Sequence, residues 1–287
     1  MSEADPAATR PRPPRLWGIH AQPSRALGWW IAALPFLLAM LAYGIASDLR
    51  HRDNPADKLL PYAGQMVDAV QRMALKRDVR TGQYVMARDT VASLRRLGLG
   101  LLLAASCGLL LGLNMGMFPG LRGGAAPFVT FVSMIPPLSV LPILFIALGV
   151  DELAKVALIF IGVFPVITRD IFGQVQRLPR EQVTKALTLG ASQLALTYRI
   201  VLPQIWPRLI ESLRLSIGAA WLFLIAAEAI AADQGLGYRI FLVRRYLAMD
   251  VILPYVLWIT LLGYLMDLSL RQCLKRLFPW YVAGVKT

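Results

Sequence analysis

Three long runs of the chain contain no Asp, Glu, Lys or Arg, and they constrain the fold more than any other feature of the sequence. They cover residues 27–47, 97–121 and 123–150. The hydrocarbon core of a bilayer requires about 20 apolar residues in a helix. Each run meets that length, so the sequence predicts three membrane-spanning helices at these positions.

Three weaker apolar runs follow at residues 153–168, 209–232 and 251–270, with their charges mostly near the ends. Long charged side chains at such positions can reach the membrane interface. The composition agrees, because 16% of the residues are charged, against about 25% in soluble domains. Backbone groups in lipid must pair within their own helix. We therefore expect an all-α, polytopic membrane protein with about six transmembrane helices.

The same pattern divides the chain into segments. The first apolar run is too long for the core of a signal peptide and no small-residue cleavage site follows it, so it is expected to remain as an anchor. We expect a cytoplasmic basic tail at 1–25, a first transmembrane helix at 26–47, a periplasmic loop at 48–96, a five-helix core at 97–273 and a cytoplasmic tail at 274–287. Residues 63–75 of the periplasmic loop are expected to form an amphipathic helix at the membrane surface. The core includes a cytoplasmic loop at 169–207.

The formal net charge of +13 does not indicate a nucleic-acid-binding protein. Membrane proteins keep Lys and Arg in loops, where they fix orientation and contact anionic lipid, and no nucleic-acid motif is present. The positive-inside rule places both termini and loop 169–207 in the cytoplasm. Loop 48–96 is an exception, because it carries ten Lys or Arg and six Asp on the opposite side. It could dock a protein electrostatically or lie on lipid headgroups.

The polar stretch 181–203, set between two apolar runs, indicates a docking element. Val183, Ala186, Leu187 and Gly190 fall at i, i+3, i+4 and i+7, which forms one narrow apolar face on a short helix. Most of these side chains are small, so another protein surface could approach the backbone closely. We interpret the stretch as the docking site of a separate soluble protein.

Turn and cap residues predict the shape of this element. Gly190 interrupts the first helix and Ser192 is a suitable N-cap for a second one. Pro203 is expected to end the second helix, and Pro207 to start the next at its first turn. The segment should therefore form a helix–turn–helix elbow between two spans.

The elbow resembles a known family. Gly190, nine further residues and then Ile200-Val201-Leu202-Pro203 match the G-x9-I-x-LP part of the signature loop of permease subunits in binding-protein-dependent ABC importers. Segments 89–100, 135–155 and 226–240 and the Phe-Pro-Trp ending at 278–280 resemble the nitrate, sulfonate, taurine and bicarbonate branch. The likeness covers roughly residues 90–280. The wider family begins the loop with Glu-Ala-Ala, whereas Thr184, Lys185 and Ala186 stand here, so no salt bridge from an acidic residue is implied.

The resemblance implies the type I ABC importer permease fold in a bacterial inner membrane. It implies a second permease subunit (identical or a paralogue), two cytoplasmic ABC ATPases and a periplasmic substrate-binding protein. The cargo would be a small solute such as a sulfonate, taurine or nitrate-like anion. ATP and Mg would bind to the partner ATPase, so this chain is expected to be a non-catalytic subunit without cofactor, metal or catalytic residue. The implied ATPase-docking residues are Val183, Thr184, Lys185, Ala186, Leu187, Gly190, Ala191, Ile200, Leu202 and Pro203.

Two spans hold candidates for the translocation pathway or its gate. Prolines free backbone carbonyls in a helix, and such breaks line cavities in membrane proteins, although ordinary kinking and close packing of small residues are the alternative. Glu228 near the outer end of the fifth span is expected to be reached by water, and to gate the outer mouth or cap a loop. Asn114 is expected to bond a neighbouring helix, and Asp233 to cap the helix after the fifth span. The candidates are Thr130, Ser133, Met134, Pro136, Pro137, Ser139, Ser216, Trp221 and Glu228.

Other function classes fit the sequence less well. The chain has no GxxxxGK[ST], GxSxG or HExxH motif, and its two histidines lie outside the predicted spans. The main alternative is a secondary transporter or channel that works without ATP. No inverted repeat and no acidic relay across the spans supports that alternative.

Overall fold

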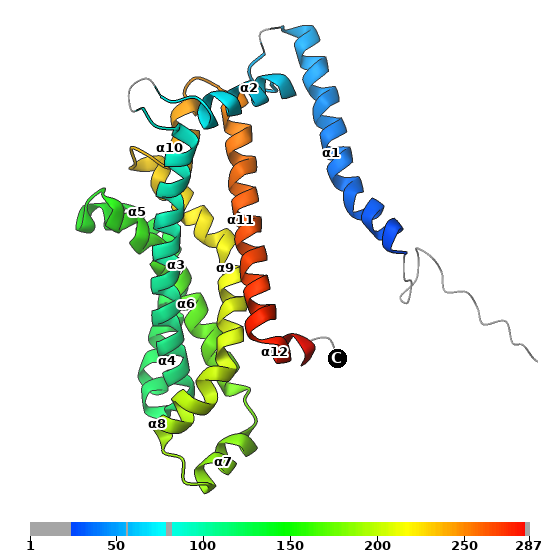
Figure 1. The fold of residues 1–287 in the computed structure, drawn as a ribbon. Coiled ribbons are helices and arrows are strands. Elements are labelled where there is room, and N and C mark those ends of the chain that lie inside the picture. Colours follow the sequence, from blue (N-terminus) through cyan, green and yellow to red (C-terminus); the bar gives the residue numbers. More distant parts are fainter. Residues whose placement is uncertain (1–23, 56, 79–81, 285–287) are drawn as a thin grey trace, which may run out of the picture. The chain divides into compact units, whose positions relative to one another are not determined.

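The computed structural model describes residues 24–55, 57–78 and 82–284, and it is helical almost throughout those ranges (Figure 1). Its one β feature there is an isolated antiparallel bridge between Arg77 and Tyr84. Most of the expected basic tail, residues 1–23, and the last three residues lie outside the described ranges. The elements are α1 Arg25–Asp53, α2 Ala63–Ala74, α3 Val85–Met117, α4 Pro119–Ser133, α5 Pro137–Leu148, α6 Glu152–Gln176, α7 Arg180–Thr188, α8 Gln193–Ala195, the π-helix η1 Leu196–Val201, α9 Leu202–Ile230, α10 Leu236–Arg244, α11 Met249–Leu277 and α12 Pro279–Gly284.

Five of the six predicted spans are confirmed by helix length and composition, and the remaining one corresponds to a bent pair of helices. Five helical stretches in the described ranges are long and apolar enough to cross a membrane: α1, α3, α6, the continuous stretch Gln193–Ile230 and α11. The predicted third span is the bent pair α4 and α5, whose axes differ by 97°. The helices extend beyond the apolar runs, because α1 continues to Asp53 and α3 begins at Val85. The predicted loop 48–96 therefore contains the end of one span and the first turns of the next.

The first structural unit, Met1–Tyr62, contains α1. Ser24 caps this helix, since its Oγ accepts a hydrogen bond from the Leu27 N–H at 3.4 Å. The segment after α1 folds back onto the end of the helix: Tyr43 Oη donates to the Pro61 carbonyl at 2.7 Å and Ser47 Oγ to the Leu60 carbonyl at 2.8 Å. The apolar side chains of α1 are largely exposed, as expected of a lipid-facing anchor.

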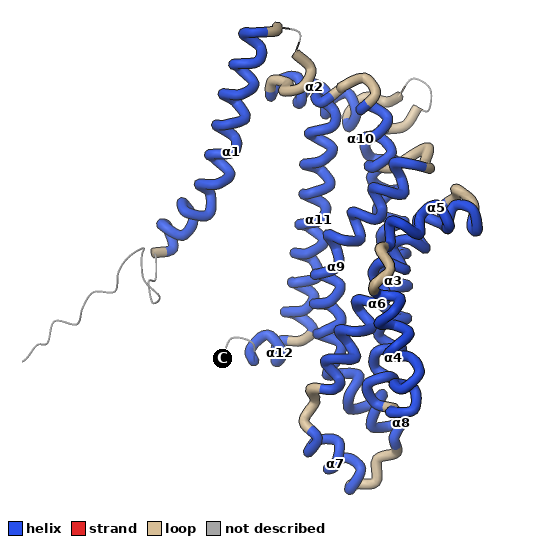
Figure 2. Tube along the Cα trace, turned by 180° about the vertical axis from the view of Figure 1, so that it is seen from behind, coloured by secondary structure: helices blue, strands red, loops and turns tan. Residues whose placement is uncertain are grey.

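The second unit, Ala63–Thr287, is a bundle built around α3, α6 and α9. Helices α2 and α10 lie at one end of α3, and α7 and α12 lie toward the other (Figures 1 and 2). We call these the α10 end and the α7 end. The segment predicted as an amphipathic helix forms α2, which buries Ala69 and leaves its polar face exposed; its place at a membrane surface stays a prediction.

Close approach of α3 and α6 depends on glycine. A β-carbon on Gly100 would lie 2.7 Å from Ile159, one on Gly108 2.8 Å from Ile167, and one on Gly112 2.6 Å from the Thr168 carbonyl oxygen. Small residues on one face allow helix backbones in a membrane to pack closely, where the hydrophobic effect contributes little. The glycines therefore position the two central helices of the bundle.

Candidate functional site

The predicted elbow is present at the α7 end of the bundle. Helix α7 ends at Thr188, and Gly190, two residues later, has a φ of +83° in the left-handed region. The Ala191 N–H donates to the Ala186 carbonyl at 3.0 Å and the Gly190 N–H to the Leu187 carbonyl at 2.9 Å, which is the Schellman ending of a helix. Ser192 then caps α8, as predicted, by accepting from the Ala195 N–H at 3.2 Å.

The apolar face of α7 points into the bundle. Ala186 is only 9% exposed and belongs to the hydrophobic core, with Val183 packed against the same cluster. The expectation that Ala186 presents a small surface to a second protein is therefore wrong, because its own chain covers it. Leu187 and Leu189 are exposed, the latter at 80%. The other predicted docking residues divide in the same way: Thr184, Lys185, Gly190 and Pro203 are exposed, whereas Ala191, Ile200 and Leu202 are partly buried and pack against the core.

The expected helix ends at Pro203 and Pro207 are wrong. Helix α8, the π-helix η1 and α9 form one continuous stretch, Gln193–Ile230. The Leu202 N–H donates to the Thr197 carbonyl, five residues back. In an α-helix the ring of Pro203 would meet the carbonyl four residues before it. The wider π-helical turn directly before Pro203 provides the altered register in which the helix continues.

The third span carries a break that the prolines predict. Helix α4 ends at Ser133, and the chain turns through Met134–Pro136 before α5 begins at Pro137. Helix α5 projects from the side of the bundle (Figures 1 and 2). Ser133 Oγ donates to the Thr130 carbonyl at 2.7 Å and Ser139 Oγ to the Pro136 carbonyl at 2.7 Å. The two hydroxyl groups thus donate hydrogen bonds to backbone carbonyls at the break, where the regular i to i+4 pattern of the α-helix is interrupted.

The candidates of the fifth span lie inside the bundle. Ser216 is buried and donates to the Ser212 carbonyl at 2.8 Å. Trp221 is buried near Gly263 of α11, and its indole N–H has no hydrogen-bond partner among the described residues. The expectation that water reaches Glu228 is wrong, because that residue is 0% exposed. A pathway or gate role for these three residues stays a prediction.

Glu228 belongs to a buried ionic cluster at the α10 end. Arg96 of α3 is 1% exposed, and its Nη1 donates to Glu228 Oε1 at 2.7 Å. The same guanidinium donates to both carboxylate oxygens of Glu152 at 2.6 Å, in a bidentate pair. Lys155, a charged residue near the start of the apolar run 153–168, is buried, and its Nζ donates to the Val150 carbonyl at 3.1 Å. The cluster joins the start of α6 and the end of α9 to α3.

Side chains from α3 and α9 also hold the start of α10. Asp89 accepts from the Gly235 N–H at 3.1 Å, Ser93 from the Leu236 N–H at 2.9 Å, and Glu228 from the Gly237 N–H at 2.8 Å. These three groups satisfy helix N–H donors that have no partner within α10. The expectation that Asp233 caps this helix is wrong, since Gly235 is the N-cap residue and long-range acceptors already bind the N–H groups at the start of the helix.

Arg239 of α10 is anchored on the same side of α3. Its Nε donates to Asp89 Oδ2 at 2.8 Å. Burial lowers the pKa of Arg239, but the hydrogen bond and charge of Asp89 outweigh burial and leave the pKa above its usual value. Arg239 therefore remains a cation, and it compensates the buried carboxylate of Asp89.

Polar pairs near the α7 end tie α9 to its neighbours. Arg208 forms a bidentate pair with Asp170 of α6, with Nε–Oδ2 at 2.8 Å. Tyr281 of α12 donates to Glu211 at 2.7 Å, and burial, together with that hydrogen bond, raises the pKa of Tyr281 to about 12. Tyr281 therefore stays a donor at neutral pH. The helix–helix bond predicted for Asn114 is confirmed, since Asn114 Nδ2 donates to Tyr198 Oη at 3.0 Å.

Comparison with known proteins identifies the family. Residues 104–279 match the family described as the binding-protein-dependent transport system inner membrane component. The chain is 34% identical over 190 residues to the taurine transport system permease protein TauC of Escherichia coli, a match that covers 66% of this chain and 69% of that protein. It is 31% identical over 193 residues to the bicarbonate transport system permease protein CmpB of Synechocystis, covering 67% and 69%.

A solved structure shares the fold. An inward-facing form of the MetNI methionine ABC transporter aligns with a TM-score of 0.60 and 17% identity, over 67% of this chain and 96% of that one. At this identity the likeness shows the fold alone, which is that of a type I ABC importer permease. With the family match and the permease relatives of the taurine, sulfonate and bicarbonate systems, the chain belongs to the inner-membrane permease components of binding-protein-dependent ABC importers for small solutes.

Proposed function

We propose that this chain forms half of an ATP-driven import pathway and receives the motion of a cytoplasmic ATPase through its elbow. The observation that carries this proposal is the α7 elbow, which lies beyond the ends of the bundle helices (Figures 1 and 2). Its outer surface carries exposed Leu187, Leu189 and Leu194. A projecting helix with exposed leucines fits a groove on a soluble partner.

The packing of the elbow supports transmission of force. Val183 and Ala186 fix one face of α7 against the bundle, while Thr184 and Lys185 face outward. The second helix of the elbow, α8, continues through η1 into α9 as one stretch, Gln193–Ile230, and the Schellman turn at Gly190 joins α7 to it. A partner that displaces α7 would therefore displace α9, which is the behaviour that rigid-body alternating access requires.

The broken third span is the proposed lining of the pathway. Met134 is exposed at the break, and Thr130, Ser133 and Ser139 provide hydroxyl groups around it. Irregular backbone at membrane depth is tolerated where it lines a cavity. A second permease subunit, identical or paralogous, would complete the pathway there, and a periplasmic binding protein would deliver a small anion of the taurine, sulfonate or bicarbonate kind. ATP and Mg would bind to the two ATPases.

The proposed orientation places the α7 end in the cytoplasm and the α10 end in the periplasm of a bacterial inner membrane. The C-terminal helix α12 lies toward the α7 end (Figure 1), so the C-terminus would be cytoplasmic. If the bent pair α4 and α5 crosses the membrane as one span, the chain has six spans and the N-terminus lies on the same side. This agrees with the positive-inside rule for loop 169–207.

Capture of the ATPase by tagged variants tests the proposal. Leu189→Asp should abolish stoichiometric co-purification of an ATPase subunit, because removal of an exposed anchor from such an interface typically weakens binding by about 30-fold or more. Leu75→Asp is the matched control, since Leu75 is similarly exposed and follows α2 at the opposite end of the bundle. If Leu189→Asp retains the ATPase and ATP-dependent uptake at the level of the control, the elbow is not the docking site.

A further inference from the structure

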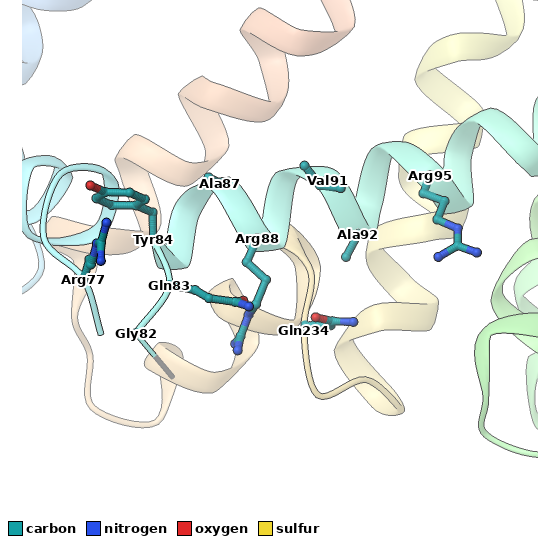
Figure 3. A pocket seen from close by; sticks show the side chains of 10 residues that line it. All are labelled: Arg77, Gly82, Gln83, Tyr84, Ala87, Arg88, Val91, Ala92, Arg95 and Gln234. Carbon is teal, nitrogen blue, oxygen red and sulfur yellow. The ribbon is translucent and has the colours of Figure 1, made fainter. Parts of the chain in front are cut away.

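An open pocket lies beside the first turns of α3 at the α10 end of the bundle. Its volume is about 590 Å³. Figure 3 shows Arg88 extending from α3 alongside Gln83, Gln234 reaching in from the turn that follows α9, and Arg95 two turns further along α3. Arg77 stacks its guanidinium over the Tyr84 ring at 5.7 Å on the far side. Three arginines therefore surround one hollow.

The lining of the pocket carries three arginines. None of the described residues that line it is acidic. Two carboxylates of α3 and α6 form their ion pairs with other arginines, Asp89 with Arg239 and Glu152 with Arg96, although the Glu152 charge also acts on Arg95. Arg88 and Arg95 form no ion pair or hydrogen bond within the described ranges, and the buried Nε of Arg88 has no partner there. The site can accept an anion from outside the chain.

The arginines stand at the end of an exposed apolar stripe on α3. Arg88 and Arg95 are seven residues apart and therefore share one face of α3. The same face continues with exposed Leu99, Leu102 and Leu110, in a helix long and apolar enough to span the membrane. Arginine at the end of such a stripe lies at the depth of lipid headgroups.

We propose that this pocket binds the phosphate of an anionic phospholipid in the outer leaflet, with the acyl chains lying along the leucine stripe. Arginine forks bind phosphate oxygens with directed, charge-assisted hydrogen bonds. The apolar surface directly below the pocket favours lipid over an acidic side chain of a docking protein, since a soluble partner would not cover that stripe. The assignment to the outer leaflet rests on the proposed orientation of the importer.

The proposal accounts for the basic character of loop 48–96, which opposes the positive-inside rule. Three of its ten basic residues, Arg77, Arg88 and Arg95, line this one pocket. These arginines would then hold the protein at the membrane surface, and they would not act as a signal that sets its topology.

Native mass spectrometry of the full chain tests the site. Protein would be released from vesicles of phosphatidylcholine that contain one fifth phosphatidylglycerol, and the fraction that retains phosphatidylglycerol would be measured. Each arginine at a membrane surface contributes about fivefold to such binding, so Arg88→Gln with Arg95→Gln should lower retention roughly 25-fold. Arg245→Gln is the matched control, because Arg245 is exposed at the end of α10 and forms no ion pair in the described ranges.

Three results would overturn the proposal. The first is equal retention by the double variant and the control. The second is stabilisation of the wild type by inorganic phosphate as large as that by phosphatidylglycerol, which would indicate a site for a free anion. The third is loss of binding-protein affinity by the double variant in pure phosphatidylcholine, which would indicate a protein-docking site. Lipid retention needs no ATPase, so failure of the Leu189 experiment leaves this test intact.

Discussion

The buried pair between Arg96 and Glu228 should dominate the stability of the α10 end. Replacement of Arg96 by Met leaves the Glu228 carboxylate in a site that is 0% exposed, with neutral donors only. Removal of one partner of a buried ion pair costs about 3–5 kcal/mol, because the remaining charge is uncompensated. Glu152, by contrast, can be hydrated when Arg96 is lost, because its side chain is 60% exposed.

The double variant separates this cost from general loss of packing. Glu228→Gln removes the second charge and keeps an acceptor for the Gly237 N–H. Arg96→Met with Glu228→Gln should therefore be less destabilised than the sum of the single variants, with a coupling free energy of about 2–3 kcal/mol. The exposed pair Arg72–Asp250, 3.1 Å apart at the same end, provides the matched control. Its coupling free energy should be about 0–1 kcal/mol.

Reversible unfolding in mixed micelles, followed by far-ultraviolet circular dichroism, measures these free energies. The four proteins of each double-mutant cycle would be compared at neutral pH. Equal coupling in the buried and the exposed pair would refute the reasoning, because burial is the physical cause of the predicted difference.

Three further substitutions test the packing and the elbow. Gly112→Leu should destabilise the bundle by about 1–3 kcal/mol, because a β-carbon there would lie 2.6 Å from the Thr168 carbonyl oxygen; an unchanged thermal midpoint would contradict this. Gly190→Val should cost about 1–2 kcal/mol, since φ is +83°, and should make the elbow more sensitive to protease; wild-type resistance would argue against it. Tyr281→Phe should cost about 1 kcal/mol through loss of the bond to Glu211. That cost should be equal at pH 7 and pH 9, because a pKa of about 12 keeps Tyr281 protonated at both; a smaller cost at pH 9 would contradict the assignment.

The spans and the elbow were predictable because their causes are local. A charge-free run of sufficient length can satisfy its backbone in lipid only as a helix. Gly190 and Ser192 act within one turn of themselves, and both behave as the sequence indicates. The prolines around Met134 likewise predict a break, although the 97° bend depends on packing that no local rule specifies.

The wrong predictions concern contacts between residues that are distant in the sequence. The residue spacing predicts the apolar face of α7, but residues of the same chain cover Ala186 on that face. Pro203 ends no helix, because a π-helical turn precedes it and no propensity rule locates such a turn. One sequence pattern does indicate the ionic cluster. A polar face on the predicted helix is formed at i, i+4 and i+7 by Asp89, Ser93 and Arg96, at the point where the helix enters its apolar run.

Co-purification with reconstituted transport tests the central claim most directly. The tagged chain would be expressed with its neighbouring genes, extracted in mild detergent and placed in vesicles. The account predicts a stoichiometric partner that contains a phosphate-binding loop, and uptake of a small solute only when ATP is supplied. A chain that purifies alone and moves solute without ATP would contradict the account and support a secondary transporter or channel.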